Sequence, residues 1–182
     1  MNQRRSFFSL SLKASLVLAS ASSLPLVGRA AVATPAERTL SLYNTHTGES
    51  VKSVFWAEGQ FIPDALQDIN KVLRDHRTNA VAAIDPQLLL LLDQVNGKMD
   101  SNKPLHIISG YRSPESNALL NASTTGVAKH SMHMDGKAID IRMPGRNLAQ
   151  LRKAAMSLRG GGVGYYPDSQ FVHMDTGRLR SW

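Results

Sequence analysis

Cysteine is absent from the 182-residue chain. This absence excludes disulfide bonds, thiol catalysis, thiolate zinc sites and lipid attachment at a processed N-terminal cysteine. No basic stretch of the sequence is interleaved with aromatic residues, which argues against a nucleic-acid partner. The apolar fraction of 42% is nevertheless typical of a globular protein, so a hydrophobic core or a bound metal ion must hold the fold together.

Long hydrophobic runs are also missing. The apolar stretch near residues 14–27 is short and rich in serine, which argues against a stable membrane span. It follows the basic pair Arg4-Arg5 and precedes the small-residue pattern AVA at 31–33, and this is the layout of a secretory signal peptide. Because Ser-Phe-Phe follows the arginine pair, the segment also resembles a twin-arginine export signal. An uncleaved membrane anchor is the alternative.

We therefore expect a signal peptide at residues 1–33, a linker at 34–38 and an exported domain at 39–182. Acidic residues are in the minority, with 14 Asp and Glu against 21 Lys and Arg. The signal peptide holds four of the basic residues and none of the acidic ones, so the exported chain carries a net charge of only about +3. This mild excess suits an anionic polymer such as the cell wall.

Hydrophobic periodicity in the first half predicts a hairpin followed by two helices. TLSLYN and SVKSVFWA are β-prone runs on either side of the turn-like segment THTGES. Apolar residues at positions 62, 65, 66, 69, 72 and 73 have helical spacing. Asp85-Pro86 begins a second helix, which is nearly apolar all round its first turns and is expected at the centre of the core.

The second half alternates short strands with helices. LHIISGYR, KAIDIRM, GVGYYP and FVHMDTG are predicted strands, PESNALLNAS is a predicted helix, and Asn147 is the expected cap of a last helix. The whole pattern predicts one α+β domain in which a small antiparallel β-sheet packs against helices. The order of the strands does not follow from the sequence.

The segment HSMHMDGKAID at 130–140 contains the strongest candidate for a metal site. Strand alternation places Asp140 on the sheet face opposite Ile139 and Ile141, where a carboxylate is costly to bury without a partner. Gly136 permits a tight turn that returns His133 toward Asp140.

A later strand offers a third ligand. In FVHMD, His173 and Asp175 alternate with the apolar residues Val172 and Met174. If the two strands are neighbours, His133, Asp140 and His173 converge on one face of the sheet. Two imidazoles and one carboxylate that leave a water position open are suited to catalytic zinc. The other candidates, His46 and His76, have no acidic or histidine neighbour at useful spacing, and we expect solvated side chains.

Five segments together resemble a known family. They are NTHTGES at 44–50, IISGYRS at 107–113, GVAKHSMH at 126–133, GGVGYYP at 161–167 and FVHMDTGRLRSW at 171–182. The chain thereby resembles the MepK-type (YcbK) murein endopeptidases, which belong to the LAS group of zinc metallopeptidases with D-Ala-D-Ala peptidases, lysostaphin-type enzymes and hedgehog domains. The resemblance extends from about Thr39 to Trp182.

The resemblance implies a periplasmic zinc (Zn2+) enzyme that hydrolyses peptide cross-links of peptidoglycan, with 3-3 links between meso-diaminopimelate residues favoured. By position, the family's metal ligands carry over to His133, Asp140 and His173. Arg112 matches an arginine that related peptidases place near the substrate carbonyl, although a structural salt bridge at the strand end is the alternative role. Ser131 falls where the motif has a small polar residue.

Two further site residues remain open. Tyr165 is our candidate to line a groove for the stem peptide, and Tyr166 is the alternative. Relatives often place Glu, Asp or His two or three positions before the third ligand as the catalytic base, but Gln170 and Phe171 occupy those positions here. We predict Asp175 as the base, because strand alternation puts it on the same face as His173; Asp168 and His130 are the alternatives.

Two other functions are compatible with the same residues. A wall-binding module would keep the fold without catalysis, and the missing acidic residue before His173 is the one feature in its favour. A carboxypeptidase that trims D-Ala ends, or an endopeptidase for 4-3 links, would use the same zinc site on another bond.

Overall fold

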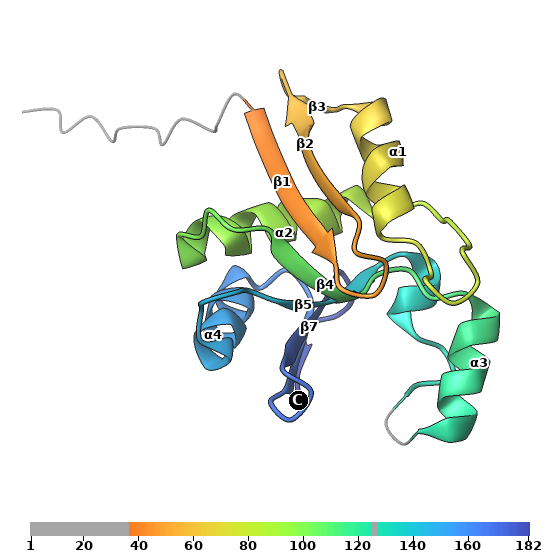
Figure 1. Ribbon diagram of the computed structural model, residues 1–182. Helices are drawn as coiled ribbons and strands as arrows, with labels where there is room; N and C mark the ends of the chain where they lie inside the picture. Colours follow the sequence, from red (N-terminus) through yellow and green to blue (C-terminus); the bar gives the residue numbers. More distant parts are fainter. Residues whose placement is uncertain (1–36, 125–126) are drawn as a thin grey trace, which may run out of the picture. The chain divides into compact units, whose positions relative to one another are not determined.

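In the computed structural model, which describes residues 37–124 and 127–182, the chain forms one eight-stranded sheet with four α-helices (Figure 1). The predicted signal peptide at 1–33 lies outside the described residues. The first strand begins at Glu37, so the last two residues of the predicted linker belong to the domain. Within the described ranges, no helix has the length and hydrophobicity needed to cross a membrane.

Along the chain, three strands are followed by two helices, then by a strand, a helix, a 3-10 helix, a strand and a helix, and finally by three more strands. The strands are β1 (Glu37–Asn44), β2 (Ser50–Ala57), β3 (Gln60–Phe61), β4 (Leu105–Ser109), β5 (Ala138–Arg142), β6 (Gly162–Tyr166), β7 (Phe171–Asp175) and β8 (Arg180–Ser181). The helices are α1 (Pro63–Val72), α2 (Pro86–Met99), α3 (Pro114–Ser123) and α4 (Leu148–Leu158), with a 3-10 helix η1 at Met132–Asp135. Each predicted strand and helix is present.

The sheet has the strand order β3-β2-β1-β4-β5-β7-β6-β8. Most neighbouring strands are antiparallel, as predicted, but β1 pairs with β4 in parallel and β6 pairs with β8 in parallel. The first parallel pair arises because α1 and α2 lie between β1 and β4 along the chain, and such a long crossover connection permits a parallel neighbour. The α+β class is confirmed, with a mixed rather than a wholly antiparallel sheet.

Side-chain caps fix where the helices begin. The Asp85 carboxylate accepts a hydrogen bond from the Gln87 backbone N–H at 2.9 Å, and the Asn147 side chain accepts from the N–H groups of the first turn of α4. Both caps were predicted. Ser113 caps α3 in the same way, since its hydroxyl accepts a hydrogen bond from the Ser116 backbone N–H.

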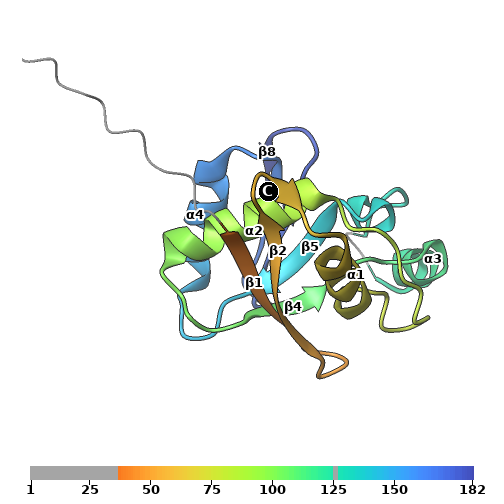
Figure 2. The same cartoon turned by 90° about the horizontal axis from the view of Figure 1, so that it is seen from above.

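One face of the sheet carries the core. Helix α2 lies along the sheet beside α4, and α1 packs on β1 and β2 (Figures 1 and 2). The apolar side chains of β5 and β7 that point to this side, Ile139, Ile141, Val172 and Met174, are almost completely buried among those of the helices. Because side chains alternate along a strand, residues 140 and 173 lie on the opposite face.

Three short elements were not predicted. β3 and β8 contain two residues each, and η1 is a four-residue 3-10 turn. Segments this short show no hydrophobic period, so only the tertiary fold defines them. β8 is the important omission, because it carries Arg180 to the site described next.

Candidate metal centre

Asp140 of β5 and His173 of β7 face each other across two neighbouring strands. They are direct partners in the antiparallel register, and the His173 Nδ1 atom lies 2.9 Å from Asp140 Oδ1. The exposed fractions of the two residues are 6% and 8%. A carboxylate this deeply buried requires compensating partners.

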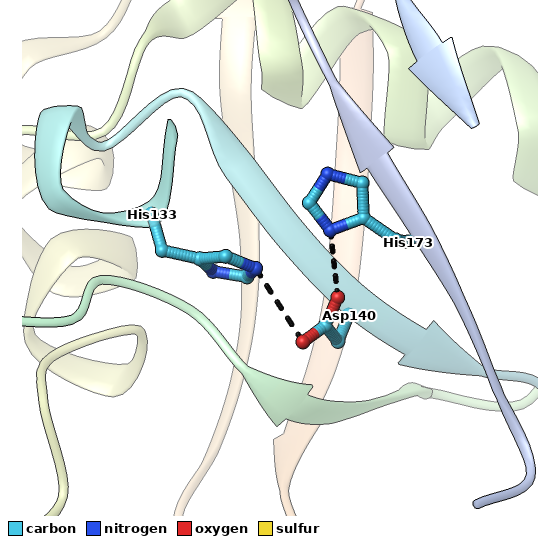
Figure 3. Close-up of side chains that lie close together, drawn as sticks. All are labelled: His133, Asp140 and His173. Carbon is cyan, nitrogen blue, oxygen red and sulfur yellow. Dashed lines mark hydrogen bonds and ion pairs between the residues drawn. The ribbon is translucent and has the colours of Figure 1, made fainter. Parts of the chain in front are cut away.

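His133 reaches the same carboxylate from the turn that precedes β5. It lies in η1, which Ser131 caps at its start and Gly136 ends with a φ of 65° in the left-handed region. The His133 Nε2 atom lies 3.4 Å from Asp140 Oδ2, so the two imidazoles approach opposite oxygens of one carboxylate (Figure 3). The predicted glycine turn and the predicted convergence of the three residues are both present.

The outer nitrogen of each imidazole is already engaged. His133 Nδ1 lies 2.7 Å from the Gly110 carbonyl oxygen, to which it donates, and His173 Nε2 lies 3.0 Å from Asp175 Oδ2. These two contacts fix the tautomers that leave His133 Nε2 and His173 Nδ1 free as ligand atoms. The ligand atoms of His133, Asp140 and His173 all lie within 4.8 Å of one another.

This donor set fits a divalent cation. Burial by itself would raise the pKa of Asp140, but the charge and hydrogen bonds of His133 and His173 outweigh it and hold that pKa well below its usual range. The site therefore presents an ionised carboxylate beside two imidazoles, and imidazole with carboxylate is a combination that zinc accepts.

Asp175, our predicted base, has a different environment. Its exposed fraction is 1%, and its oxygens accept hydrogen bonds from the backbone N–H of Gly162 and of Gly177 and from His173 Nε2. Arg180 of β8 adds an ion pair of 2.6 Å. Burial would raise the pKa of Asp175, but these hydrogen bonds lower it well below the usual range. Such contacts favour an orienting role for Asp175 over proton transfer.

Arg112 lies near the Asp140 oxygen that His133 also approaches. Its Nη2 is 4.0 Å from Asp140 Oδ2, and its remaining hydrogen bonds, to Asn117 and Ser109, are long at 3.4 and 3.3 Å. Its Nε is buried without a hydrogen-bond partner among the described residues. The guanidinium therefore keeps donor capacity for a further acceptor.

A cleft of about 550 Å³ opens over these residues. His130, Ser131 and Tyr166 line it together with the three ligand residues and Arg112. Tyr165 does not line it; its ring packs against the core under Arg152. The structure thus favours Tyr166 over Tyr165 as a groove residue, because neighbouring residues of β6 point to opposite faces.

Comparison with known proteins gives the family. A family model described as peptidoglycan L,D-endopeptidase MepK matches residues 32–182. The chain belongs to the MepK family. It is similar to the peptidoglycan L,D-endopeptidase MepK of Escherichia coli K12, with 46% identity over 159 residues that cover 87% of each chain. It is also similar to the probable peptidoglycan L,D-endopeptidase MepK of Haemophilus influenzae, with 41% identity over 160 residues, or 87% of this chain and 86% of that one. No solved structure gives a significant match.

Family membership confirms the resemblance that the sequence motifs indicated. Peptidases of this MepK family, which belong to the M15 group, depend on a metal ion, and the buried His133, Asp140 and His173 form a candidate site for one.

Two residues of the site were missed from the sequence. Arg180, which donates a hydrogen bond to Asp175, lies in a strand of two residues, too short to show a pattern in the sequence. Trp182 lies against His173, with ring centroids 5.3 Å apart. The Trp182 indole N–H also donates to the Tyr166 hydroxyl at 2.8 Å. The one signal that could have pointed to these two residues is their position in FVHMDTGRLRSW, the segment that also contains His173.

Proposed function

We propose that this MepK-family chain is a zinc-dependent endopeptidase that hydrolyses peptide cross-links of peptidoglycan in the periplasm, with 3-3 meso-diaminopimelate links as its favoured substrate. The observation that carries the proposal is the convergence of His133 Nε2, an Asp140 oxygen and His173 Nδ1 at the floor of a cleft. The names of the relatives as L,D-endopeptidases agree with the 3-3 link.

His133, Asp140 and His173 would hold the zinc ion. When bound, zinc supplies a Lewis acid that lowers the pKa of water to about 7 and polarises a carbonyl group. The Gly110 carbonyl and the Asp175 carboxylate keep the two imidazoles in the required tautomers and orientations.

Arg112 acts on the substrate carbonyl. Because it lines the cleft beside Asp140 and is incompletely hydrogen-bonded, its guanidinium can donate to the carbonyl oxygen as negative charge develops there. Loss of one such donor typically lowers the rate on the order of a hundredfold or more. Ser131 and Tyr166 border the same cleft and contact the stem peptide.

His130 is the proton acceptor that the cleft supports best. Of the three candidates, Asp175 is enclosed by hydrogen bonds, and Asp168 lies in the exposed turn between β6 and β7 and does not line the cleft. His130 does line it, and imidazole is the side chain that most often transfers protons in enzyme active sites. His130 would take a proton from the attacking water and return it to the leaving amine.

A digest of cross-linked muropeptides tests the function. Purified protein is incubated with 3-3 and 4-3 linked dimers, with and without a chelator, and the products are analysed by mass. We expect the 3-3 dimers to become monomers, with the activity lost in chelator and restored by added zinc. Loss of a single D-Ala from intact dimers would indicate a carboxypeptidase, and retention on murein without any product would indicate a binding module.

Export remains part of the proposal. The basic start, the short apolar stretch and the AVA pattern support a signal peptide at residues 1–33, and a substrate located in the cell wall requires export. Expression of the full chain, followed by N-terminal sequencing of the secreted protein, tests the cleavage after residue 33.

A further inference from the structure

We infer that the cleft has a second binding element, formed by His46, His76 and Arg77, which binds a free carboxylate of the substrate stem peptide. We call this element the His-Arg pocket end. The inference rests on the proposed function, because it assigns a part of that same substrate to a part of the same cleft.

Positively charged and hydrogen-bond-donating side chains outnumber carboxylates in the cleft. Its described lining contains three arginines and five histidines but a single carboxylate, that of Asp140. Asp140 is committed to His133 and His173, and Arg180 is committed to Asp175. Arg77 has no ion pair within the described residues, so its charge is available to a ligand. A cleft with such an excess of donors favours an anionic substrate.

His46 and His76 stack on each other. The imidazole rings of His46 and His76 stack with centroids 3.9 Å apart and planes 6° from parallel, although they come from segments thirty residues apart. His46 is exposed, as predicted for a solvated side chain, and His76 is half-buried; the stacking itself was not predicted. Burial lowers the pKa of His76, and the neighbouring His46 and Arg77 lower it further, so the His76 ring offers an N–H donor while Arg77 supplies the charge.

Buried polar side chains hold both segments in place. Asn44, at the end of β1, accepts hydrogen bonds from the backbone N–H of His46 at 2.9 Å and donates to the Val72 carbonyl at 2.8 Å. Asp75 accepts from the Arg77 backbone N–H at 2.9 Å and from the backbone and hydroxyl of Ser113 at 2.8 and 2.7 Å. These contacts fix the positions of the two turns before any ligand binds.

The sheet sets the distance between the two elements of the cleft. β1 lies two strands away from β5 in the sheet order, and two strand spacings amount to about 10 Å. An extended peptide covers that distance in about three residues. The His-Arg pocket end is therefore too far from Asp140 to touch the bond that is cut, but within reach of another group of the same stem peptide.

Arg112 lines the cleft together with both elements. Its Nη2 lies 4.0 Å from Asp140 Oδ2, and Arg77 lines the same cleft. A carboxylate held at Arg77 would thus place the peptide with its scissile carbonyl near Arg112. Binding there would affect substrate affinity more than the rate of the chemical step.

Amidated substrates test the inference. Steady-state kinetics are measured on 3-3 linked muropeptides in three forms: with all carboxylates free, with the diaminopimelate side-chain carboxylate converted to a carboxamide, and with the terminal α-carboxylate converted to a carboxamide. We expect one of the two amidations to raise KM about ten- to a hundredfold, with a much smaller change in kcat, because a charged hydrogen bond is lost. The amidation that does so identifies the carboxylate.

Variants connect that effect to the residues. In Arg77→Met the free-acid substrate should show the raised KM, and amidation should then add little further change, as in a double-mutant cycle. Arg142→Met removes an exposed arginine of β5 that does not line the cleft, and it should keep the wild-type preference. Arg77→Met with an undiminished preference for the free acid would overturn the inference.

A binding measurement separates this inference from the proposed function. Calorimetry with the uncross-linked stem tripeptide, in free and amidated forms, needs no turnover. If the wild-type protein cleaves no muropeptide but binds the free acid more tightly in an Arg77-dependent way, the function fails and the carboxylate site stands. Equal affinity for the free and both amidated tripeptides would overturn the site while leaving the endopeptidase activity unaffected.

Discussion

Arg180 donates hydrogen bonds to both oxygens of the Asp175 carboxylate, at 3.0 Å to Oδ1 and 2.6 Å to Oδ2. The pair is bidentate, which is the strongest geometry for an arginine and a carboxylate. Asp175 in turn accepts from His173 Nε2, so a two-residue strand at the sheet edge determines the orientation of a metal ligand. The support of the site therefore extends one layer beyond the three ligands.

The first prediction concerns Asp175→Asn. The substitution removes the charge that Arg180 and His173 share and directs amide hydrogens toward one of these two donors. We expect a ten- to hundredfold loss of metal affinity, which is typical when a partner of a ligating histidine is changed. Competition with a chromophoric chelator measures it. Unchanged metal affinity with lost turnover would instead support the role as base that the sequence suggested.

Two arginines of the same segment provide the matched control for that prediction. Arg180→Gln should also weaken metal binding, because Asp175 loses its bidentate partner, whereas Arg178→Gln removes an exposed arginine with no ion pair in the described part of the chain. Equal metal affinities of the two variants would contradict the proposed support.

The second prediction separates the candidate bases. His130→Ala should keep the metal and the fold but lower kcat by about a hundredfold to ten-thousandfold, which is the usual contribution of a positioned proton acceptor. Asp168→Asn should leave kcat within about twofold, because Asp168 does not line the cleft. Kinetics on 3-3 muropeptides, with the metal content of each variant measured in parallel, give the result. A normal kcat in His130→Ala would remove His130 from the mechanism.

The third prediction concerns the turn that brings His133 back to Asp140. Gly136 has a φ of 65°, and a Cβ added there would meet the backbone carbonyl of Ala83. Gly136→Ala should therefore destabilise the protein by about 1–3 kcal/mol or more and weaken metal binding. Urea unfolding measures the first effect and chelator competition the second.

Gly97 offers the control for the glycine substitution. It lies in α2 with open space around its Cβ position, so Gly97→Ala should stabilise the protein by about 0.5–1 kcal/mol through helix propensity. A loss of stability in Gly97→Ala comparable to that in Gly136→Ala would mean that the turn has no special requirement for glycine.

The sequence predicted the convergence of His133, Asp140 and His173 because their pattern is local. Alternation along β5 and β7 places Asp140 and His173 on one face, and a single glycine returns His133 to it. The environment of Asp175 was not predictable in the same way. Alternation placed it correctly beside His173, but its burial depends on Arg180, which arrives through a parallel pairing of β8 with β6.

The stack of His46 on His76 shows the same limit. Each histidine is in a polar segment with no useful neighbour in the sequence, and only the crossing of two turns brings the rings together. Contacts between turns depend on the sheet order, and the order was not predictable from strand patterns. Tyr165 and Tyr166 differ for a simpler reason, because adjacent residues of one strand must face opposite ways and the sequence did not say which faced the cleft.

The last prediction concerns the pH dependence of stability through Asp75. Burial would raise the pKa of this carboxyl, but hydrogen bonds from the Ser113 hydroxyl and from the backbone N–H groups of Arg77 and Ser113 help to outweigh it, and the pKa lies well below its usual range. A folded-state pKa below the unfolded value of about 3.9 means that the carboxylate stabilises the protein fully above that pH. The stabilisation is lost as the pH falls from there toward the folded-state pKa.

Asp75→Asn isolates this contribution. At pH 7 the variant should be less stable than the wild type by about 1.5–3 kcal/mol, the usual worth of hydrogen bonds to a charged group. The difference should shrink between pH 5 and pH 3, because Asp75 of the unfolded wild type takes up a proton in that range while Asp75 of the folded wild type stays ionised. Urea unfolding at several pH values measures it, with chelator present throughout so that proton binding by the metal ligands is common to both proteins. A stability difference that stays constant from pH 7 to pH 3 would mean that the Asp75 charge does not hold the turn, and that the Arg77 segment is fixed by shape alone.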